Sequence, residues 1–158
     1  MDHDTALRQQ LAAILDWGDA HATFDSALKG IPLRLRGATP AGLGHSPWQL
    51  LEHLRLTQWD ILDFSVNPNY EEPASMDEYW PASVAPPSDK AWDESVAAVK
   101  HDREQLKRLA ADKNVDLFAK IPHGSGQTIL RELLLVADHT AYHVGQLVDA
   151  RRALGIWG

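Results

Sequence analysis

The sequence predicts an all-α protein: a four-helix bundle with a long proline-rich crossover connector between its second and third helices. Two observations indicate this fold. Apolar residues recur at helical spacing in four segments, and no two segments alternate apolar and polar residues as paired strands do. Between the second and third segments, residues 67–88 contain five prolines, Pro68, Pro73, Pro81, Pro86 and Pro87.

The first helix is expected over about residues 3–28. Gly30 and Pro32 follow it, and this pair of residue types is typical of a helix end. Its apolar stripe repeats every three or four residues, which marks the side that faces the core. The stripe consists of Leu7, Leu11, Ile14, Leu15, Phe24 and Leu28.

The second helix has a sharp predicted start. Ser46 is the expected N-cap, Pro47 occupies the first helical position, and Gln49 completes a capping box. Asn67-Pro68-Asn69 ends the helix. Its inward residues are Leu50, Leu54, Thr57, Ile61 and Phe64.

The connector of residues 67–88 is long enough to cross the whole bundle. Twenty extended residues reach up to about 65 Å, whereas a twenty-residue helix is about 30 Å long. The connector can therefore return along the bundle, and we expect the second and third helices to be parallel neighbours. A loop of this length is usually a crossover or a functional segment.

The third helix is expected from Ser88, its cap, to Asp112. Residues 114–127 are predicted to be irregular and to fold back onto the core. The residues expected to face inward in these two segments are Trp92, Val96, Val99, Leu106, Leu109, Val115, Leu117 and Phe118.

The fourth helix is expected from about Thr128 to Leu154, where Gly155 ends it. Its core stripe is long and is bordered by a second stripe that contains His139 and His143. The expected core residues are Leu130, Leu133, Leu134, Ala137, Ala141, Val144, Leu147 and Val148.

Length and composition limit the possible functions. A chain of 158 residues is expected to form one domain over 1–158, and its net charge of −7 is a poor match for nucleic acid. The absence of cysteine excludes disulfides, thiolate metal sites and a thiol nucleophile, so any sulfur chemistry needs an external thiol. No apolar run approaches the roughly 18 residues of a membrane span. The polar segment Met1-Asp2-His3-Asp4 is unlike a targeting peptide. We expect a cytoplasmic protein.

His139 and His143 are the first candidate metal ligands. Residues at i and i+4 share one helix face, about 5–6 Å apart at Cβ, so both imidazoles can bind one ion. Imidazole favours zinc, nickel, copper or iron. Thr140 follows the first histidine where the zincin motif has glutamate, so that mechanism is not indicated. The alternative is two ordinary helical histidines, one packed and one solvated.

His53 lies between the core positions Leu50 and Leu54 and is the third inward histidine. Taken alone, a histidine at such a position is usually a hydrogen-bonded core residue. Three buried imidazoles without partners are costly, and a shared cation would satisfy all three. His45 and His123 are alternatives for the mouth of such a site, or are surface residues.

Two segments resemble a known family. Leu135-Val136-Ala137-Asp138-His139-Thr140-Ala141-Tyr142-His143-Val144-Gly145-Gln146-Leu147 is similar to the last helix of the DinB/YfiT-like family of metal-dependent enzymes. His45-Ser46-Pro47-Trp48-Gln49-Leu50-Leu51-Glu52-His53-Leu54 is similar to its second helix, and Pro122-His123-Gly124 also fits.

The resemblance implies a four-helix bundle with one divalent metal ion, nickel or zinc. By matching position, its ligands are His53, His139 and His143. It also implies a homodimer. Characterised relatives transfer low-molecular-weight thiols or isomerise substrates with a thiol cofactor, and others are described as metal-dependent hydrolases.

Our first hypothesis is a metal-dependent enzyme that acts on a small molecule, as a thiol S-transferase or a hydrolase. Its cofactor is a divalent ion, with an external low-molecular-weight thiol as a possible second cofactor. The alternatives are a non-catalytic metal-binding stress-response protein and a bundle without metal. We expect no nucleic-acid or membrane partner.

No general base is evident in the sequence. Asp138 points about 100° away from His139 on the helix. Tyr142 is expected in the core, Gln146 could support a ligand, and Trp80 in the connector is a candidate lid residue.

Overall fold

A computed structural model describes residues 2–16 and 18–158. Over these residues the chain forms five α-helices and two short 3-10 helices, and its β-structure is limited to one isolated bridge between Lys120 and Thr128. The all-α prediction is confirmed. The elements are α1 (His3–Ile14), α2 (Phe24–Leu28), η1 (Leu33–Leu35), α3 (Pro47–Val66), η2 (Met76–Tyr79), α4 (Asp89–Ala111) and α5 (Ile129–Ala153).

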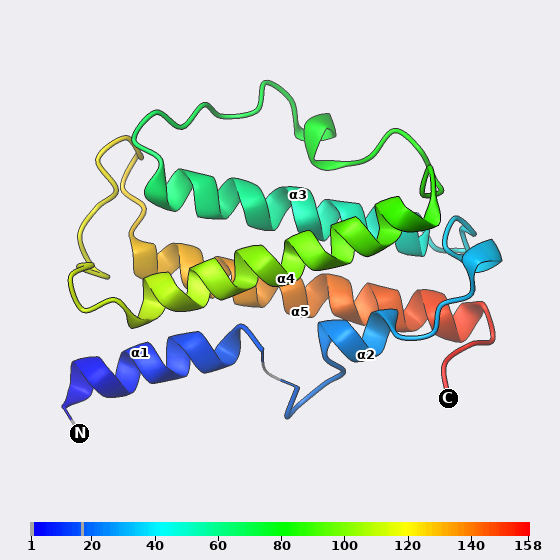
Figure 1. Ribbon diagram of the computed structural model, residues 1–158, viewed down its shortest axis with the longest axis horizontal. Helices are drawn as coiled ribbons and strands as arrows, with labels where there is room; N and C mark the ends of the chain where they lie inside the picture. Colours follow the sequence, from blue (N-terminus) through cyan, green and yellow to red (C-terminus); the bar gives the residue numbers. More distant parts are fainter. Residues whose placement is uncertain (1, 17) are drawn as a thin grey trace.

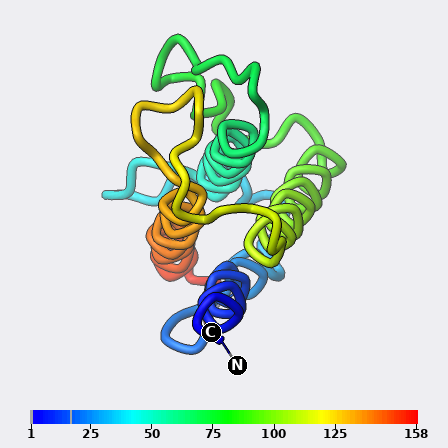
Figure 2. The backbone as a smooth tube through the Cα atoms, turned by 90° about the vertical axis from the view of Figure 1, so that its left-hand side faces the viewer, coloured from blue at the N-terminus to red at the C-terminus, as the bar shows by residue number. Residues whose placement is uncertain are grey.

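The four long helices lie side by side as a bundle. Seen end-on, α1, α3, α4 and α5 occupy four corners, with α3 opposite α1 (Figure 2). Helices α3 and α4 begin at the same end of the molecule and run in the same direction, opposite to α1 and α5 (Figure 1). Residues 67–88 return along the outer side of α3 and contain η2.

The prediction of one helix over 3–28 is wrong, because the structure divides this segment into α1 and α2. The interruption has a local cause and a distant one. Gly18 is a poor helix former. Asp16 forms ion pairs with Arg103 and Lys107 of α4 instead of continuing the helix. The Thr23 side chain then accepts a backbone N–H and starts α2. Both short helices still contribute to the core, α1 with Leu11 and α2 with Phe24 and Leu28.

The other predicted helix ends are confirmed. The Ser46 hydroxyl accepts the Gln49 N–H at 3.2 Å, and the Gln49 side chain accepts the Ser46 N–H at 3.1 Å, which completes the capping box. The Ser88 hydroxyl accepts the Ala91 N–H at the start of α4, and the Thr128 hydroxyl accepts the Arg131 N–H at the start of α5. Gly155, after α5, has a positive φ of 72°, which glycine adopts without a Cβ penalty.

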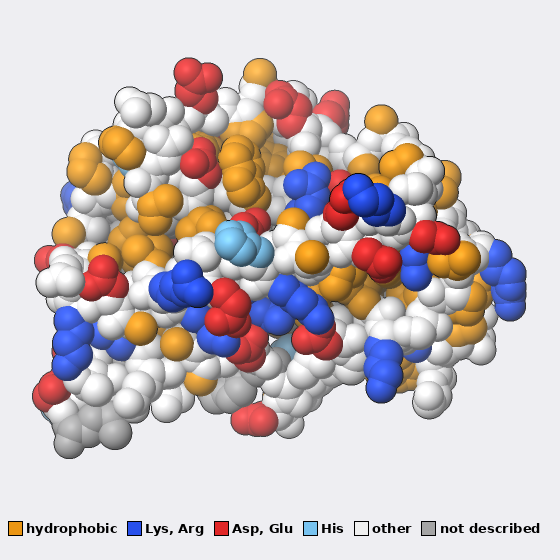
Figure 3. Space-filling model, in the orientation of Figure 1, with side chains coloured by type: hydrophobic (Ala, Val, Ile, Leu, Met, Phe, Trp, Pro, Cys, Tyr) orange, Lys and Arg blue, Asp and Glu red, His pale blue; other side chains and the backbone are white. Residues whose placement is uncertain are grey.

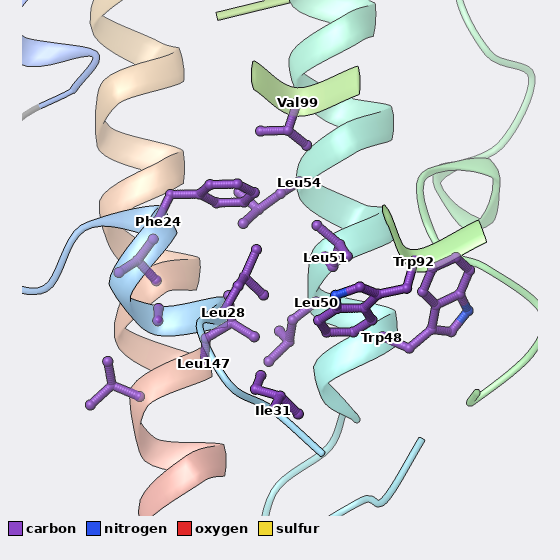
Figure 4. Close-up of a cluster of buried hydrophobic side chains, with 13 residues drawn as sticks. Phe24, Leu28, Ile31, Trp48, Leu50, Leu51, Leu54, Trp92, Val99 and Leu147 are labelled. Carbon is purple, nitrogen blue, oxygen red and sulfur yellow. The ribbon is translucent and has the colours of Figure 1, made fainter. Parts of the chain in front are cut away.

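The core consists of two clusters of buried apolar side chains, one toward each end of the bundle. In the first cluster, Phe24 and Leu28 of α2 face Leu51 and Leu54 of α3, with Leu147 of α5 packed against them (Figure 4). These contacts hold α3 against α5, the two helices that carry the three candidate histidines.

Two of the residues predicted to face inward in the α5 stripe and in residues 114–127 are exposed. Leu134 of α5 is 46 % exposed and Phe118 is 63 % exposed. The Asp116 side chain accepts the backbone N–H of Phe118 and of Ala119, and this turn directs Leu117 inward and Phe118 outward. Periodicity alone does not reveal such a turn.

On the face of the molecule shown in Figure 3, acidic and basic side chains are interspersed, and hydrophobic side chains gather between the connector and α4. None of the helices in the described parts of the chain combines the length and apolarity needed to cross a membrane.

Candidate metal centre

The structure brings together the three histidines that the sequence singles out. His53 extends from α3, and His139 and His143 extend from successive turns of α5. One potential ligand atom from each residue lies within 4.8 Å of the other two. The Nε2 atoms of His53 and His139 are 3.1 Å apart.

The Nδ1 atoms of His53 and His143 both face oxygen acceptors. His53 Nδ1 is 2.8 Å from the backbone carbonyl of Tyr79, and His143 Nδ1 is 2.7 Å from Gln146 Oε1. The Gln146 amide nitrogen in turn donates to the Tyr142 hydroxyl at 3.3 Å. Because a carbonyl oxygen can only accept, the ring proton of each imidazole resides on Nδ1 and leaves a lone pair on Nε2.

His139 is oriented in the same way by a hydroxyl. Thr57 Oγ1 donates to the backbone carbonyl of His53 at 2.6 Å and lies 3.4 Å from His139 Nδ1. Since its single proton is already donated, this oxygen can accept the Nδ1–H of His139 when a cation occupies Nε2 of that ring. His53 and His143 therefore keep a lone pair on Nε2, and His139 can present one as well.

Burial keeps these imidazoles neutral. Desolvation, followed by the neighbouring imidazoles, lowers the pKa of His139 from 6.5 to about 4. Desolvation also lowers the pKa of His143 to about 4, against the raising effect of the Gln146 hydrogen bond. The pKa of His53 is lowered for the same main reason. Neutral imidazole is the form that binds metal ions.

The donor set fits a divalent transition-metal ion. The Nε2 atoms of His53 and His139 are 3.1 Å apart, so without an ion one ring can donate an Nε2 proton to the other, and a cation can take the place of that proton. In metal sites, ligating histidines usually donate their second N–H to a carbonyl or a similar acceptor. His53 and His143 do so here, and Thr57 Oγ1 lies 3.4 Å from His139 Nδ1, where it can serve as the third acceptor.

Residues 17–147 match the family model of the DinB superfamily. The chain belongs to the DinB superfamily. No curated protein and no solved structure matches the chain significantly. All three histidines lie within the matched residues, so the resemblance of the two histidine-containing segments is confirmed at the level of the family.

Trp80 forms one wall of the histidine cluster in this DinB-superfamily protein. Its indole stacks on the His53 ring at 3.9 Å between ring centroids and 5° between planes, and on the His45 ring at 4.0 Å and 18°. It also contacts His143 edge-on at 6.2 Å. The predicted lid residue thus covers one of the histidines directly.

Asp60 holds the connector against α3. Its two carboxylate oxygens accept the hydroxyls of Tyr70 and Tyr79, each at 2.9 Å. Desolvation and the bond to Asp60 raise the pKa of Tyr79 to about 12 and also raise that of Tyr70, so both hydroxyls stay protonated as donors. These tyrosines line a cavity of about 400 Å³ between the connector, α3 and the start of α5.

Other predicted residues lie elsewhere. Tyr142 is 65 % exposed, so the prediction that it belongs to the core is wrong. Asp138 is exposed on α5 and lines a different cavity, next to α1 and α2. The His123 Nε2 atom donates to the Phe64 carbonyl at 2.8 Å, away from the cluster.

Sequence reasoning missed the supporting residues. Thr57 was expected only as part of the core stripe, and neither Asp60 nor Tyr79 was singled out. Thr57 and Asp60 follow His53 by four and seven residues, the spacing of one helix face, and this pattern could have indicated them. The carbonyl of Tyr79 leaves no such signal.

Proposed function

We propose that this protein binds a divalent metal ion, nickel or zinc, through the Nε2 atoms of His53, His139 and His143, and that it is a metal-dependent enzyme acting on a small molecule. One observation carries the proposal. Three neutral imidazoles, each with an oxygen beside its Nδ1 atom, bring one potential ligand atom apiece to within 4.8 Å of the others.

The ligand number favours catalysis over a structural role, because three protein ligands leave a coordination position open. When bound, such an ion would lower the pKa of a coordinated thiol or water molecule. The chain has no cysteine, so the sulfur of an S-transferase reaction must come from an external low-molecular-weight thiol. Trp80 shields His53 from solvent on one side. A thiol S-transferase and a hydrolase both fit this arrangement.

The proposed space for a small-molecule substrate is the cavity of about 400 Å³ lined by Asp60 and Tyr79, which is not lined by the three histidines and adjoins their cluster through Tyr79. Its volume lies within the range typical of ligand pockets. We propose a homodimer as the working assembly, with no nucleic-acid or membrane partner. Light scattering of the purified protein tests the assembly, and a monomer at all concentrations would contradict it.

Metal content and thermal stability test the ion. We expect about one nickel or zinc ion per chain, and a higher melting temperature after the metal-free protein is reloaded, since a ligand that binds only the folded state stabilises it. His53→Ala should abolish both effects and keep the helical circular dichroism signal. His101→Ala, an exposed histidine of α4, is the matched control. Full metal content in the double variant His139→Ala, His143→Ala would refute the ligand set.

A transfer screen tests catalysis. The metal-loaded protein is assayed with common cellular thiols and electrophiles, and separately with hydrolysable esters and amides. Turnover that disappears in His53→Ala supports the enzyme proposal. Stoichiometric metal with no turnover in either screen would favour the non-catalytic metal-binding alternative.

A further inference from the structure

Asp60 occupies an unusual position between the histidine cluster and the connector. It lies on α3, seven residues after His53, and is half-buried. Its carboxylate forms no hydrogen bond or ion pair with the three imidazoles. Its carboxylate instead accepts two hydroxyls from one connector, those of Tyr70 and Tyr79, at 2.9 Å each.

Tyr79 is fixed to α3 at two points. Its hydroxyl donates to Asp60, and its backbone carbonyl accepts the Nδ1–H of His53 at 2.8 Å. The next residue, Trp80, stacks on the same imidazole. One residue of the connector thus links a carboxylate to a candidate metal ligand through its own backbone.

We propose that Asp60 is a positioning residue: by holding the Tyr79 hydroxyl, it places the Tyr79 carbonyl on His53 Nδ1 and so sets the tautomer and orientation of this imidazole. The effect of Asp60 on metal binding rests on the proposed function. The effect of Asp60 on the His53 tautomer is independent of metal.

The connector needs such an anchor because it is long and largely irregular. Apart from the four residues of η2, residues 67–88 have no regular structure. Beyond Trp80, Ser46 Oγ donates to the Val84 carbonyl at 2.5 Å and secures the far part of the connector. Before Trp80, Asp60 secures the near part. A carbonyl on an unanchored loop would not orient a histidine ring reliably. In other metal sites, loss of a group that is hydrogen-bonded to a metal ligand usually weakens metal affinity about 10–100-fold.

The first arm of the test uses metal-free protein. Long-range proton–nitrogen NMR spectra report which ring nitrogen of His53 carries the proton. In the wild type we expect the Nδ1–H tautomer, and in Asp60→Ala and Tyr79→Phe a mixture with the Nε2–H form. Tyr70→Phe should have a smaller effect, since only Tyr79 also holds His53. Asp63→Ala is the matched control, because that carboxylate of the same helix pairs with Asn67 instead.

The second arm uses cobalt(II) as a spectroscopic probe. Asp60→Ala should weaken cobalt binding about 10–100-fold and alter the visible absorption of the bound ion, while Asp63→Ala leaves both unchanged. Tyr79→Phe, which removes one oxygen and retains the carbonyl, gives the same readout should Asp60→Ala fail to fold. An unchanged His53 tautomer in both variants would overturn the inference. Absence of cobalt binding by the wild type would instead refute the proposed function, and the tautomer spectra would still decide the role of Asp60.

Discussion

The Nε2 atoms of His53 and His139 lie 3.1 Å apart although the two residues are 86 positions apart in the sequence. The contact joins α3 to α5, so only the folded bundle forms it. The Nδ1 proton of His53 leaves a lone pair on its Nε2 atom, which in the metal-free protein can accept the Nε2–H of His139. A cation bound between the two rings would replace that proton.

This arrangement predicts that the metal-free protein loses stability as the pH falls. The pKa of His139 and that of His143 are lowered from 6.5 to about 4 by burial. Between these values the unfolded chain binds more protons than the folded chain, so the stabilising contribution is complete above pH 6.5 and is lost as the pH falls toward 4. Thermal melts of chelator-treated protein at a series of pH values measure this loss.

The control is His139→Gln, His143→Gln, which retains polar side chains that do not titrate in this range. Between pH 6.5 and 4, the melting temperature of this double variant should depend less on pH than that of the wild type. Equal pH dependence in the wild type and the double variant would show that other groups are responsible.

A second prediction concerns Gln146, which accepts the Nδ1–H of His143. Gln146→Leu keeps the size of the side chain and removes the acceptor, so the Nδ1 proton is no longer fixed. We expect metal affinity to fall about 10–100-fold with little change in helical content. Competition with a chromophoric chelator measures the affinity. Asp149→Ala, one turn further along α5, should bind metal as the wild type does; equal affinity in Gln146→Leu would refute the role of the glutamine.

The sequence predicts three of the four long helices closely, because their ends depend on local chemistry. Ser46, Ser88 and Thr128 each cap a helix with their own hydroxyl, and such caps act within a few residues. The break between α1 and α2 was missed because part of its cause is distant. Asp16 pairs with Arg103 and Lys107, residues of another helix that no local pattern connects to it.

The three candidate ligands could also be predicted from local spacing. The hydrogen-bond acceptors that orient their imidazoles could not. Spacing places His139 and His143 on one face of one helix, and an inward position identifies His53. The acceptor for His53 is a backbone carbonyl of the connector, and every residue has a carbonyl. Only the folded path of residues 67–88 determines that Tyr79 supplies it.

Trp80 provides a third prediction. Its indole covers the His53 ring, so Trp80→Ala should expose the cluster to solvent and accelerate metal release, on the order of tenfold as for other supporting groups. Stopped-flow transfer of the ion to excess chelator measures the rate. Trp59→Ala is the matched control, since Trp59 is on α3 and is 52 % exposed. Equal release rates in the two variants would exclude a covering role for Trp80.

The last prediction separates the core from the surface of α5. Leu147 is fully buried one turn after His143, and Leu134 is 46 % exposed on the same helix. Leu147→Ala should lower the free energy of unfolding by about 2–5 kcal/mol, because it leaves a cavity between α3 and α5. Leu134→Ala should change it by less than about 0.5 kcal/mol. Urea denaturation measures both values. Since an ion that binds only the folded state adds stability, zinc should restore part of the loss in Leu147→Ala. A variant whose stability zinc does not change would show that the packing around Leu147 is needed to hold the three histidines together.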